Sequence, residues 1–330
     1  MVVINDIVYG QIEVTDQVLI ELMASAPLQR LKLIDQHGAR PMVTTGARVN
    51  RYDHCVGVML LLRKLGATVE EQVAGLLHDV PHTAFSHVID YVFTDNNNEH
   101  SFHENYFEKM VMESEIPGIL KKYGVDVHRV INESLFSLLE RGLPDLCADR
   151  LDYSFRDFMA FNNGDDGRCA RFVSHLIVHN GEIIFDDMDV ALEYAKHYLW
   201  MDKSQWSTYS SVAAYQFLGE CIKRALEIKV LTFDDLFLTD DVVLAKLRES
   251  TDEVIQDNLA YLVPTLKVEV VSAEEADISS MAKLRFVNPK VLGPERVVSL
   301  VGDLYPQMLE KVEDRRKAIE KGIFLRVVSK

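Results

Sequence analysis

The chain lacks most of the features that mark secreted and membrane proteins. It has only four cysteines among 330 residues, and none of them form a CxxC pair: Cys55, Cys147, Cys169 and Cys221. We interpret them as reduced thiols, which indicates a cytoplasmic location. No run of about 20 apolar residues occurs, so we expect no membrane-spanning helix. The first residues, MVVINDIVYGQIEV, lack the basic and apolar regions of a signal peptide.

Positive charge is also scarce. Lys and Arg number 35 against 51 Asp and Glu, which gives a net charge of −16. A protein this acidic repels phosphate backbones at long range, so we expect no tight binding to long DNA or RNA. A small phosphorylated substrate remains compatible with this charge, because a local cluster can override it. Six of the eleven His lie between His54 and His103, and four arginines flank them: Arg48, Arg51, Arg150 and Arg156.

Apolar residues recur at helical spacing through most of the first 250 residues. The pattern predicts helices over residues 15–34, 51–65, 68–79, 101–114, 127–141, 144–161, 189–227 and 232–247. Capping boxes at Thr68–Glu71 and Ser101–Glu104 favour two of these starts. A hairpin is expected over 173–184, around Asn180-Gly181.

The C-terminal part changes character. Strands are expected over 266–271, 284–287, 297–301 and 324–328, with a charged helix over 305–321. The sequence therefore predicts a mainly α protein with two parts: a helical domain over 1–255 and a small mixed α/β tail over 256–330, packed on the core.

Two imidazoles and two carboxylates stand out in the first half: His54, the adjacent pair His78-Asp79, and Asp149. Each alone is compatible with an ordinary helix or capping role. Together they form a nitrogen and oxygen ligand set that suits iron, manganese, cobalt, nickel or zinc, whereas calcium prefers oxygen alone. Pro81 disfavours helix at the preceding residue, so the helix should end at His78-Asp79, where ligands can lean toward an ion.

The order H…HD…D resembles the signature of the HD phosphohydrolase superfamily. Within it, the chain is most similar to dNTP triphosphohydrolases of the SAM-and-HD-domain type. The segments that carry the resemblance are residues 4–13, 28–38, 51–54, 75–90, 103–104 and 148–157. The resemblance implies an all-helical HD core in which His54, His78, Asp79 and Asp149 hold one divalent transition metal.

The resemblance also implies catalytic roles. His87, oriented by Asp90 three residues later, looks like the general acid toward the leaving oxygen. His103 looks like a second acid–base or phosphate-contacting group, and it is followed by Glu104, which also fits the capping box. Arg51 and His82 are expected to contact phosphate.

Further residues resemble substrate contacts. Arg150 stands where the family has a basic residue that reaches phosphate, and Gln36, Tyr153 and Asp157 resemble residues near the sugar. Mg²⁺ on the substrate phosphates is compatible with this scheme. We interpret Asp152 and Arg156 as an i,i+4 helix ion pair worth a few tenths of a kcal/mol.

Two departures from the family pattern affect specificity. Residues 200–215 contain a single cation, Lys203, where the family has several groups that grip the phosphate tail. Residues 24–28 lack the carboxylate that reads an activating guanine nucleotide. We therefore expect a weaker preference for triphosphates and no obligatory GTP activator.

The leading hypothesis is a phosphohydrolase of nucleotides, above all deoxynucleoside (tri)phosphates, in which a metal-activated water attacks phosphorus. Alternatives are an HD hydrolase of a nucleoside monophosphate, cyclic nucleotide or alarmone, and a metal-bearing nucleotide sensor. A second metal held by His82, His87 or His103 also remains open. We expect a homo-oligomer whose partner is a small-molecule nucleotide, with no membrane partner.

Overall fold

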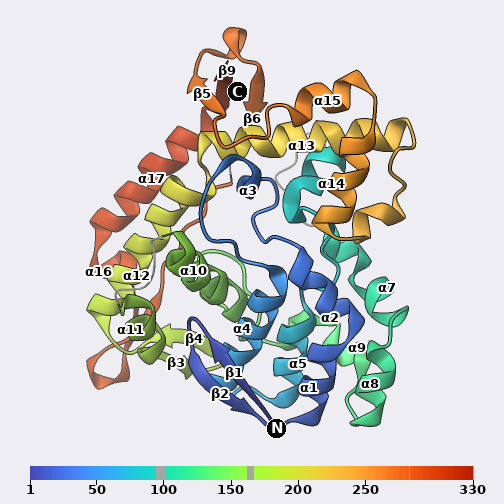
Figure 1. Ribbon diagram of the computed structural model, residues 1–330. Helices are drawn as coiled ribbons and strands as arrows, with labels where there is room; N and C mark the ends of the chain where they lie inside the picture. The colour runs from blue at the N-terminus through green and yellow to red at the C-terminus, as the bar shows by residue number, and fades with distance from the viewer. Residues whose placement is uncertain (94–101, 162–166, 282, 330) are drawn as a thin grey trace.

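A computed structural model of the chain describes residues 1–93, 102–161, 167–281 and 283–329 (Figure 1). The backbone is mainly helical, which confirms the predicted fold class. The helices are α1 Gln17–Ala24, α2 Ala26–Arg30, α3 Arg40–Val43, α4 Arg51–Lys64, α5 Val69–Leu77, α6 Asp90–Phe93, α7 Phe107–Met112, α8 Ile116–Lys122, α9 Val127–Val130, α10 Ala148–Phe161, α11 Arg168–Ser174, α12 Met188–Met201, α13 Tyr209–Glu227, α14 Asp240–Glu249, α15 Glu253–Leu259, α16 Val301–Leu304 and α17 Pro306–Glu320.

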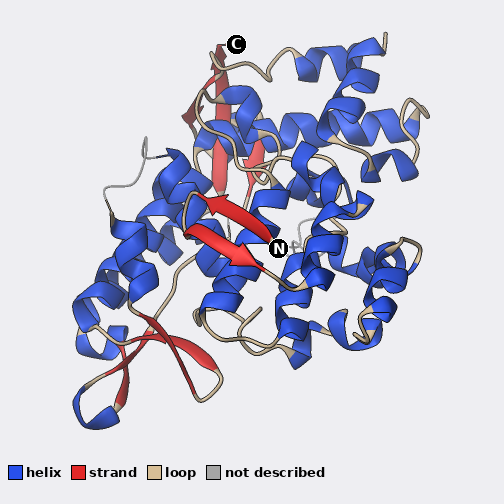
Figure 2. Cartoon of the chain, turned by 60° about the horizontal axis from the view of Figure 1, so that its bottom comes forward, coloured by secondary structure: helices blue, strands red, loops and turns tan. Residues whose placement is uncertain are grey.

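The strands form small sheets at the edges of the helical body (Figure 2). They are β1 Val2–Asp6, β2 Gly10–Val14, β3 Leu176–His179, β4 Glu182–Phe185, β5 Lys267–Val270, β6 Ile278–Ser280, β7 Lys290–Leu292, β8 Val298–Leu300 and β9 Ile323–Ser329. β1 and β2 form an antiparallel hairpin, the second sheet has the order β3-β4-β7-β8, and the third has the order β5-β9-β6. Strands that follow residue 255 thus join two different sheets.

Helices α4 and α5 pack against each other, and local sequence sets where each begins. Asn50 caps α4 by accepting a hydrogen bond from the backbone of Asp53, and Thr68 caps α5 by accepting one from Glu71. Gly75 permits the close approach of the two helices, because a Cβ there would lie 2.5 Å from Leu62 Cδ1. α5 ends at Leu77, with His78 as its C-cap residue, so the helix ends at the His78-Asp79 pair as predicted.

The buried apolar residues form two clusters. One surrounds α4, α5, α10 and α12, and the other surrounds α13. The C-terminal part contributes to both, through Val287 and Val291 in the first and Ile278 and Leu325 in the second. The division of the chain near residue 255 stays a prediction.

Several predicted elements differ from the observed ones. The helix expected over 127–141 is helical only over α9, followed by a 3-10 turn at Glu133–Leu135. Beyond that turn the backbone bonds outside its own segment: Leu138 N–H donates to Glu71 at 2.9 Å, and Leu138 C=O accepts from Ala148 N at 2.8 Å. These tertiary bonds replace a continuing helical ladder, and α10 accordingly starts at Ala148 rather than at 144.

The helix expected over 189–227 is likewise interrupted, by a π-helical turn at Asp202–Trp206. The buried Asp202 side chain accepts a 2.9 Å hydrogen bond from Arg315 Nε of α17. The strand expected over 284–287 is wrong, since the strands nearest to it are β6 and β7. Ser101, the first residue of the second capping box, lies outside the described residues. Among the helices that the structure describes, none combines the length and apolar character needed to cross a bilayer.

Candidate metal centre and active site

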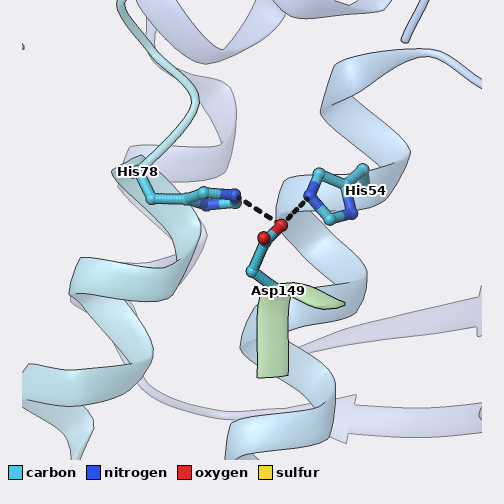
Figure 3. A group of neighbouring side chains, drawn as sticks. All are labelled: His54, His78 and Asp149. Carbon is cyan, nitrogen blue, oxygen red and sulfur yellow. Dashed lines mark hydrogen bonds and ion pairs between the residues drawn. The ribbon is translucent and has the colours of Figure 1, made fainter. Parts of the chain in front are cut away.

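Three helices bring the predicted metal ligands together. His54 comes from α4, His78 from the end of α5 and Asp149 from the first turn of α10, and the two imidazoles point toward the carboxylate (Figure 3). Asp149 Oδ1 lies 2.9 Å from His54 Nε2 and 3.5 Å from His78 Nε2. His54, His78 and Asp149 lie close enough together to hold one ion. Asp79 lies beside them, but through two different oxygens: Oδ1 is 3.5 Å from His78 Nε2 and Oδ2 is 3.8 Å from His54 Nε2. The role of Asp79 as a fourth ligand stays a prediction.

The second nitrogen of each imidazole is held in place. His54 Nδ1 lies 2.8 Å from Asp152 Oδ2, and His78 Nδ1 lies 2.8 Å from the backbone oxygen of Gly75. Both rings therefore present Nε2 toward the centre. Such outer partners fix the tautomer and orientation of ligating histidines.

Asp152 belongs to a buried ionic network. Its ion pair with Arg156 forms as expected, at 2.7 Å, but the two side chains are only 0% and 2% exposed. Arg156 also binds Asp6 at 2.7 Å, and Tyr9 Oη donates to Asp152 at 2.8 Å. The interpretation of Asp152–Arg156 as an ordinary helix pair was therefore incomplete, because this network supports His54.

The electrostatics of the group fit a divalent cation. Burial opposes protonation of His78, but Asp79 and Asp149 raise the pKa of this imidazole to about 10. Burial likewise opposes protonation of His54, whose pKa is nevertheless raised by Asp149 and Asp152. The buried Nε2 of His78 forms no hydrogen bond within the described part of the chain. The carboxylates thus favour positive charge at this point, and a nitrogen and oxygen donor set supplies the ligands that a transition metal prefers.

Arg51 and His82 flank the ligand carboxylate of Asp79. Arg51 Nη1 donates to Asp79 Oδ2 at 2.5 Å and Arg51 Nε donates to Ser86 Oγ at 2.8 Å. His82 Nε2 lies 3.1 Å from Asp79 Oδ1. Although burial opposes ionisation, Arg51, His78 and His82 hold the pKa of Asp79 well below its usual range. Both predicted phosphate contacts lie at the metal group, and their role toward phosphate stays a prediction.

The predicted general acid lies on the wall of the same cavity. His87 Nδ1 is 3.3 Å from Asp90 Oδ2, and the side chains are 31% and 5% exposed. The buried carboxylate can therefore orient the imidazole. The side chain of His103 lies outside the described residues.

A cavity of about 520 Å³ opens over the metal ligands. Its lining includes the predicted residues Gln36, Arg51, His82, His87, Arg150, Tyr153 and Asp157. Asp157 binds His37 Nε2 at 2.8 Å and Trp206 Nε1 at 2.7 Å, and the Tyr153 hydroxyl bonds that of Tyr198.

Arg150 differs from the expectation of a group that simply reaches into the cavity. Its Nη1 donates to the backbone oxygen of Asp145 at 2.5 Å, and its Nη2 donates to that of Arg141 at 2.8 Å. Both terminal nitrogens therefore hold the loop before α10, while the residue also lines the cavity.

The sequence reading missed several residues of the cavity wall. Trp206, Glu133, Glu140, Lys283 and Arg285 all line it. No segment after about residue 160 carried a specific resemblance, so the sequence held no signal for the two tail cations.

Comparison with known proteins places the chain in a family. The HD domain model matches residues 51–156. The chain is 38% identical to the uncharacterised protein YdhJ of Bacillus subtilis, over 98% of this chain and 99% of that protein. It is 33% identical to the metal-dependent phosphohydrolase cns2 of Cordyceps militaris, over 88% and 85% of the two chains. The chain belongs to the HD-domain phosphohydrolase family.

Two further likenesses bear on the fold and on the predicted subfamily. A phosphohydrolase structure from Bacteroides thetaiotaomicron superposes on this HD-domain protein with a TM-score of 0.73 at 18% identity, over 98% of this chain and 99% of that one, which shows the shared fold. The deoxynucleoside triphosphate triphosphohydrolase SAMHD1 of Mus musculus is 32% identical over 146 residues, which are 38% of this chain and 22% of that protein. The predicted HD-domain family is confirmed. The likeness to SAMHD1 covers 38% of this chain rather than its whole length.

Proposed function

We propose that this HD-domain protein is a metal-dependent phosphohydrolase of nucleotides, with deoxynucleoside phosphates as its main substrates. The observation that carries the proposal is that His54, His78, Asp79 and Asp149 lie together beneath a cavity that is also lined by His87, whose partner is the buried Asp90. A metal group alone would suit a sensor. An imidazole oriented by a buried carboxylate on the same cavity wall supports catalysis, because a pure binder needs no proton donor.

Different side chains would bind the metal, bind the phosphate and donate the proton. A divalent ion held by the four ligands would supply a Lewis acid and an acidified water. Arg51 and His82, beside Asp79, would hold the phosphate oxygens and offset their charge. His87 would donate a proton to the leaving oxygen, while Asp90 stabilises its protonated form.

The rest of the cavity suits a nucleoside. A volume of about 520 Å³ is within the range of small-molecule sites. Tyr153, Trp206 and Tyr215 give it an aromatic wall. Gln36 Oε1 is buried without a hydrogen-bond partner in the described residues, so a sugar hydroxyl could donate to it.

Product analysis tests the proposal. Purified protein with Mn²⁺ would be assayed on dATP, dGMP, ATP, a cyclic nucleotide and a guanosine alarmone, with and without GTP. We expect hydrolysis of deoxynucleotides without a requirement for GTP, and none by Asp149→Ala. Release of triphosphate, pyrophosphate or orthophosphate identifies the bond that is broken. Turnover of only the alarmone or the cyclic nucleotide would replace the proposed substrate, and strict dependence on GTP would contradict the expected regulation.

Two further properties complete the proposal. The −16 charge opposes binding to long nucleic acids, so the substrate is a small nucleotide. We also propose a homo-oligomer, which light scattering of the purified protein would test.

A further inference from the structure

Two cations from the C-terminal part of the chain reach the catalytic cavity. Lys283 and Arg285 line the same cavity as His54 and Asp149, although they lie between β6 and β7 and far beyond the HD-domain match at 51–156. The buried Asp202 carboxylate of the π-helical turn accepts a hydrogen bond from Arg315 Nε of α17 and interacts electrostatically with Arg285. Arg285 therefore lies near the π-helical turn.

Lys283 and Arg285 form no ion pair within 4.0 Å in the described part of the chain. The nearby Arg150 also carries a positive charge, although it is paired with Glu140 at 3.4 Å. Burial together with Arg285 and Arg150 lowers the pKa of Lys283, while Glu140 and Glu104 oppose the effect more weakly. In a protein with a net charge of −16, unpaired cations that converge on a cavity favour an anionic ligand there.

Lys203, unlike Lys283 and Arg285, does not line the cavity over the metal ligands. This residue is the single cation of segment 200–215, which corresponds to the helix that binds the phosphate tail in the dNTP triphosphohydrolases that the chain resembles. It lines a separate cavity with Trp200 and Lys311, between α12 and α17, and not the cavity over the metal ligands. The catalytic cavity thus draws its additional cations from a different element.

We infer that Lys283 and Arg285 form a second anion subsite, which binds substrate phosphate beyond the group held at the metal centre. The inference rests on the proposed function and specifies it: the substrate is a nucleotide with more than one phosphate. It also revises the expectation of a weak triphosphate preference, which assumed that the missing cations of 200–215 have no replacement. Charge-assisted hydrogen bonds to phosphate from Arg and Lys supply the affinity.

A competing account is that these cations only offset the carboxylates of the cavity, such as Glu104, Glu133 and Glu140. In that case their removal would disturb the metal group and weaken all substrates equally. The two accounts differ in how the effect depends on the number of substrate phosphates.

Steady-state kinetics on a phosphate series separates them. Lys283→Ala, Arg285→Ala and the double variant would be compared with the wild type on dATP, dADP, dAMP and p-nitrophenyl phosphate, with Lys203→Ala as the matched control. We expect the double variant to raise KM for dATP about 10-fold or more, the scale of losing charged hydrogen bonds. KM for dAMP and p-nitrophenyl phosphate should stay within about twofold, and Lys203→Ala should behave as wild type. Equal losses on all four substrates, or no change on dATP, would overturn the inference.

A binding measurement keeps the inference separate from the proposed function. Calorimetry with inorganic tripolyphosphate and with orthophosphate needs no turnover. The wild type should bind tripolyphosphate more tightly, the double variant should lose that difference, and the charge-preserving pair Lys283→Arg and Arg285→Lys should retain it. If the wild type prefers tripolyphosphate but hydrolyses no nucleotide, the subsite stands and the proposed function fails. If the wild type hydrolyses nucleotides without this preference, the subsite fails alone.

Discussion

At the scale of single residues, the metal ligands could be predicted from sequence because their chemistry and order are both distinctive. The imidazoles and carboxylates of His54, His78, Asp79 and Asp149 lie next to one another in the fold, and their role as metal ligands stays a prediction. The role of Asp152 could not be predicted, because a carboxylate four residues before an arginine has the same pattern whether it lies on the surface or beneath a ligand. Only the packing of α4 against α10 shows that it holds His54.

His87 provides the first test at this scale. His87→Ala should lower kcat by about 100-fold or more, the scale of losing a general acid, while metal content is unchanged because His87 is not one of the four ligands. His128→Ala, an exposed histidine of α9, is the control. Near-normal turnover in His87→Ala would move the proton-transfer role to His103.

Asp152 provides the second test at the scale of single residues. Asp152→Asn keeps the shape of the side chain but removes the charge that faces His54 Nδ1. Metal affinity, measured by competition with a chelator at fixed pH, should fall about 10- to 100-fold. Asp53→Asn, an exposed residue on the same helix as His54, should leave it unchanged. An Asp152→Asn protein with wild-type affinity would mean that this carboxylate serves folding alone.

At the scale of elements, the helices that could be predicted are those whose ends carry local signals, such as α4, α5 and α17. The predictions of continuous helices over 127–141 and 189–227 were wrong. Each helix is interrupted where its backbone or a buried carboxylate forms a hydrogen bond with a distant segment. Leu138 with Glu71 and Asp202 with Arg315 are the two cases. Such long-range hydrogen bonds do not change the spacing of apolar residues in either segment, so the sequence pattern does not reveal them.

Helix α14 supports the site through Asp240, whose titration predicts how the stability of the protein depends on pH. Asp240, its first residue, accepts hydrogen bonds from Phe85 N at 2.7 Å and Asp35 N at 2.8 Å, which fixes the turn that contains Ser86 beside Arg51. Burial raises the pKa of Asp240 to about 6. A raised carboxyl pKa means that the folded state binds the proton more tightly than the unfolded state, so this contribution to stability falls as pH rises from about 4 to about 6.

Urea unfolding of wild type and Asp240→Asn at several pH values checks this. Since asparagine does not titrate, the stability of the wild type relative to the variant should fall by about 1 kcal/mol between pH 5 and pH 7. A relative stability that is constant or rises over this interval would show that the carboxyl titrates normally.

At the scale of the whole molecule, the fold gathers one site from segments that the sequence keeps far apart. The class of fold and its metal group could be predicted, because the first 160 residues carry the motifs in order. The contribution of Lys283 and Arg285 could not, because it depends on where the tail strands pair: β7 joins the sheet of β3 and β4, whereas β6 joins β9. Local pattern does not encode that pairing.

The central claim is that three helices close one metal site, and metal stoichiometry tests it most directly. Protein loaded with Mn²⁺ or Fe²⁺ and freed of excess ion would be measured by elemental analysis, alongside Asp149→Asn and the control Asp53→Asn, with circular dichroism to establish the fold. The wild type and the control should carry about one ion per chain, and folded Asp149→Asn should lose most of it. Full occupancy in folded Asp149→Asn, or a folded wild type that retains no ion, would contradict the account.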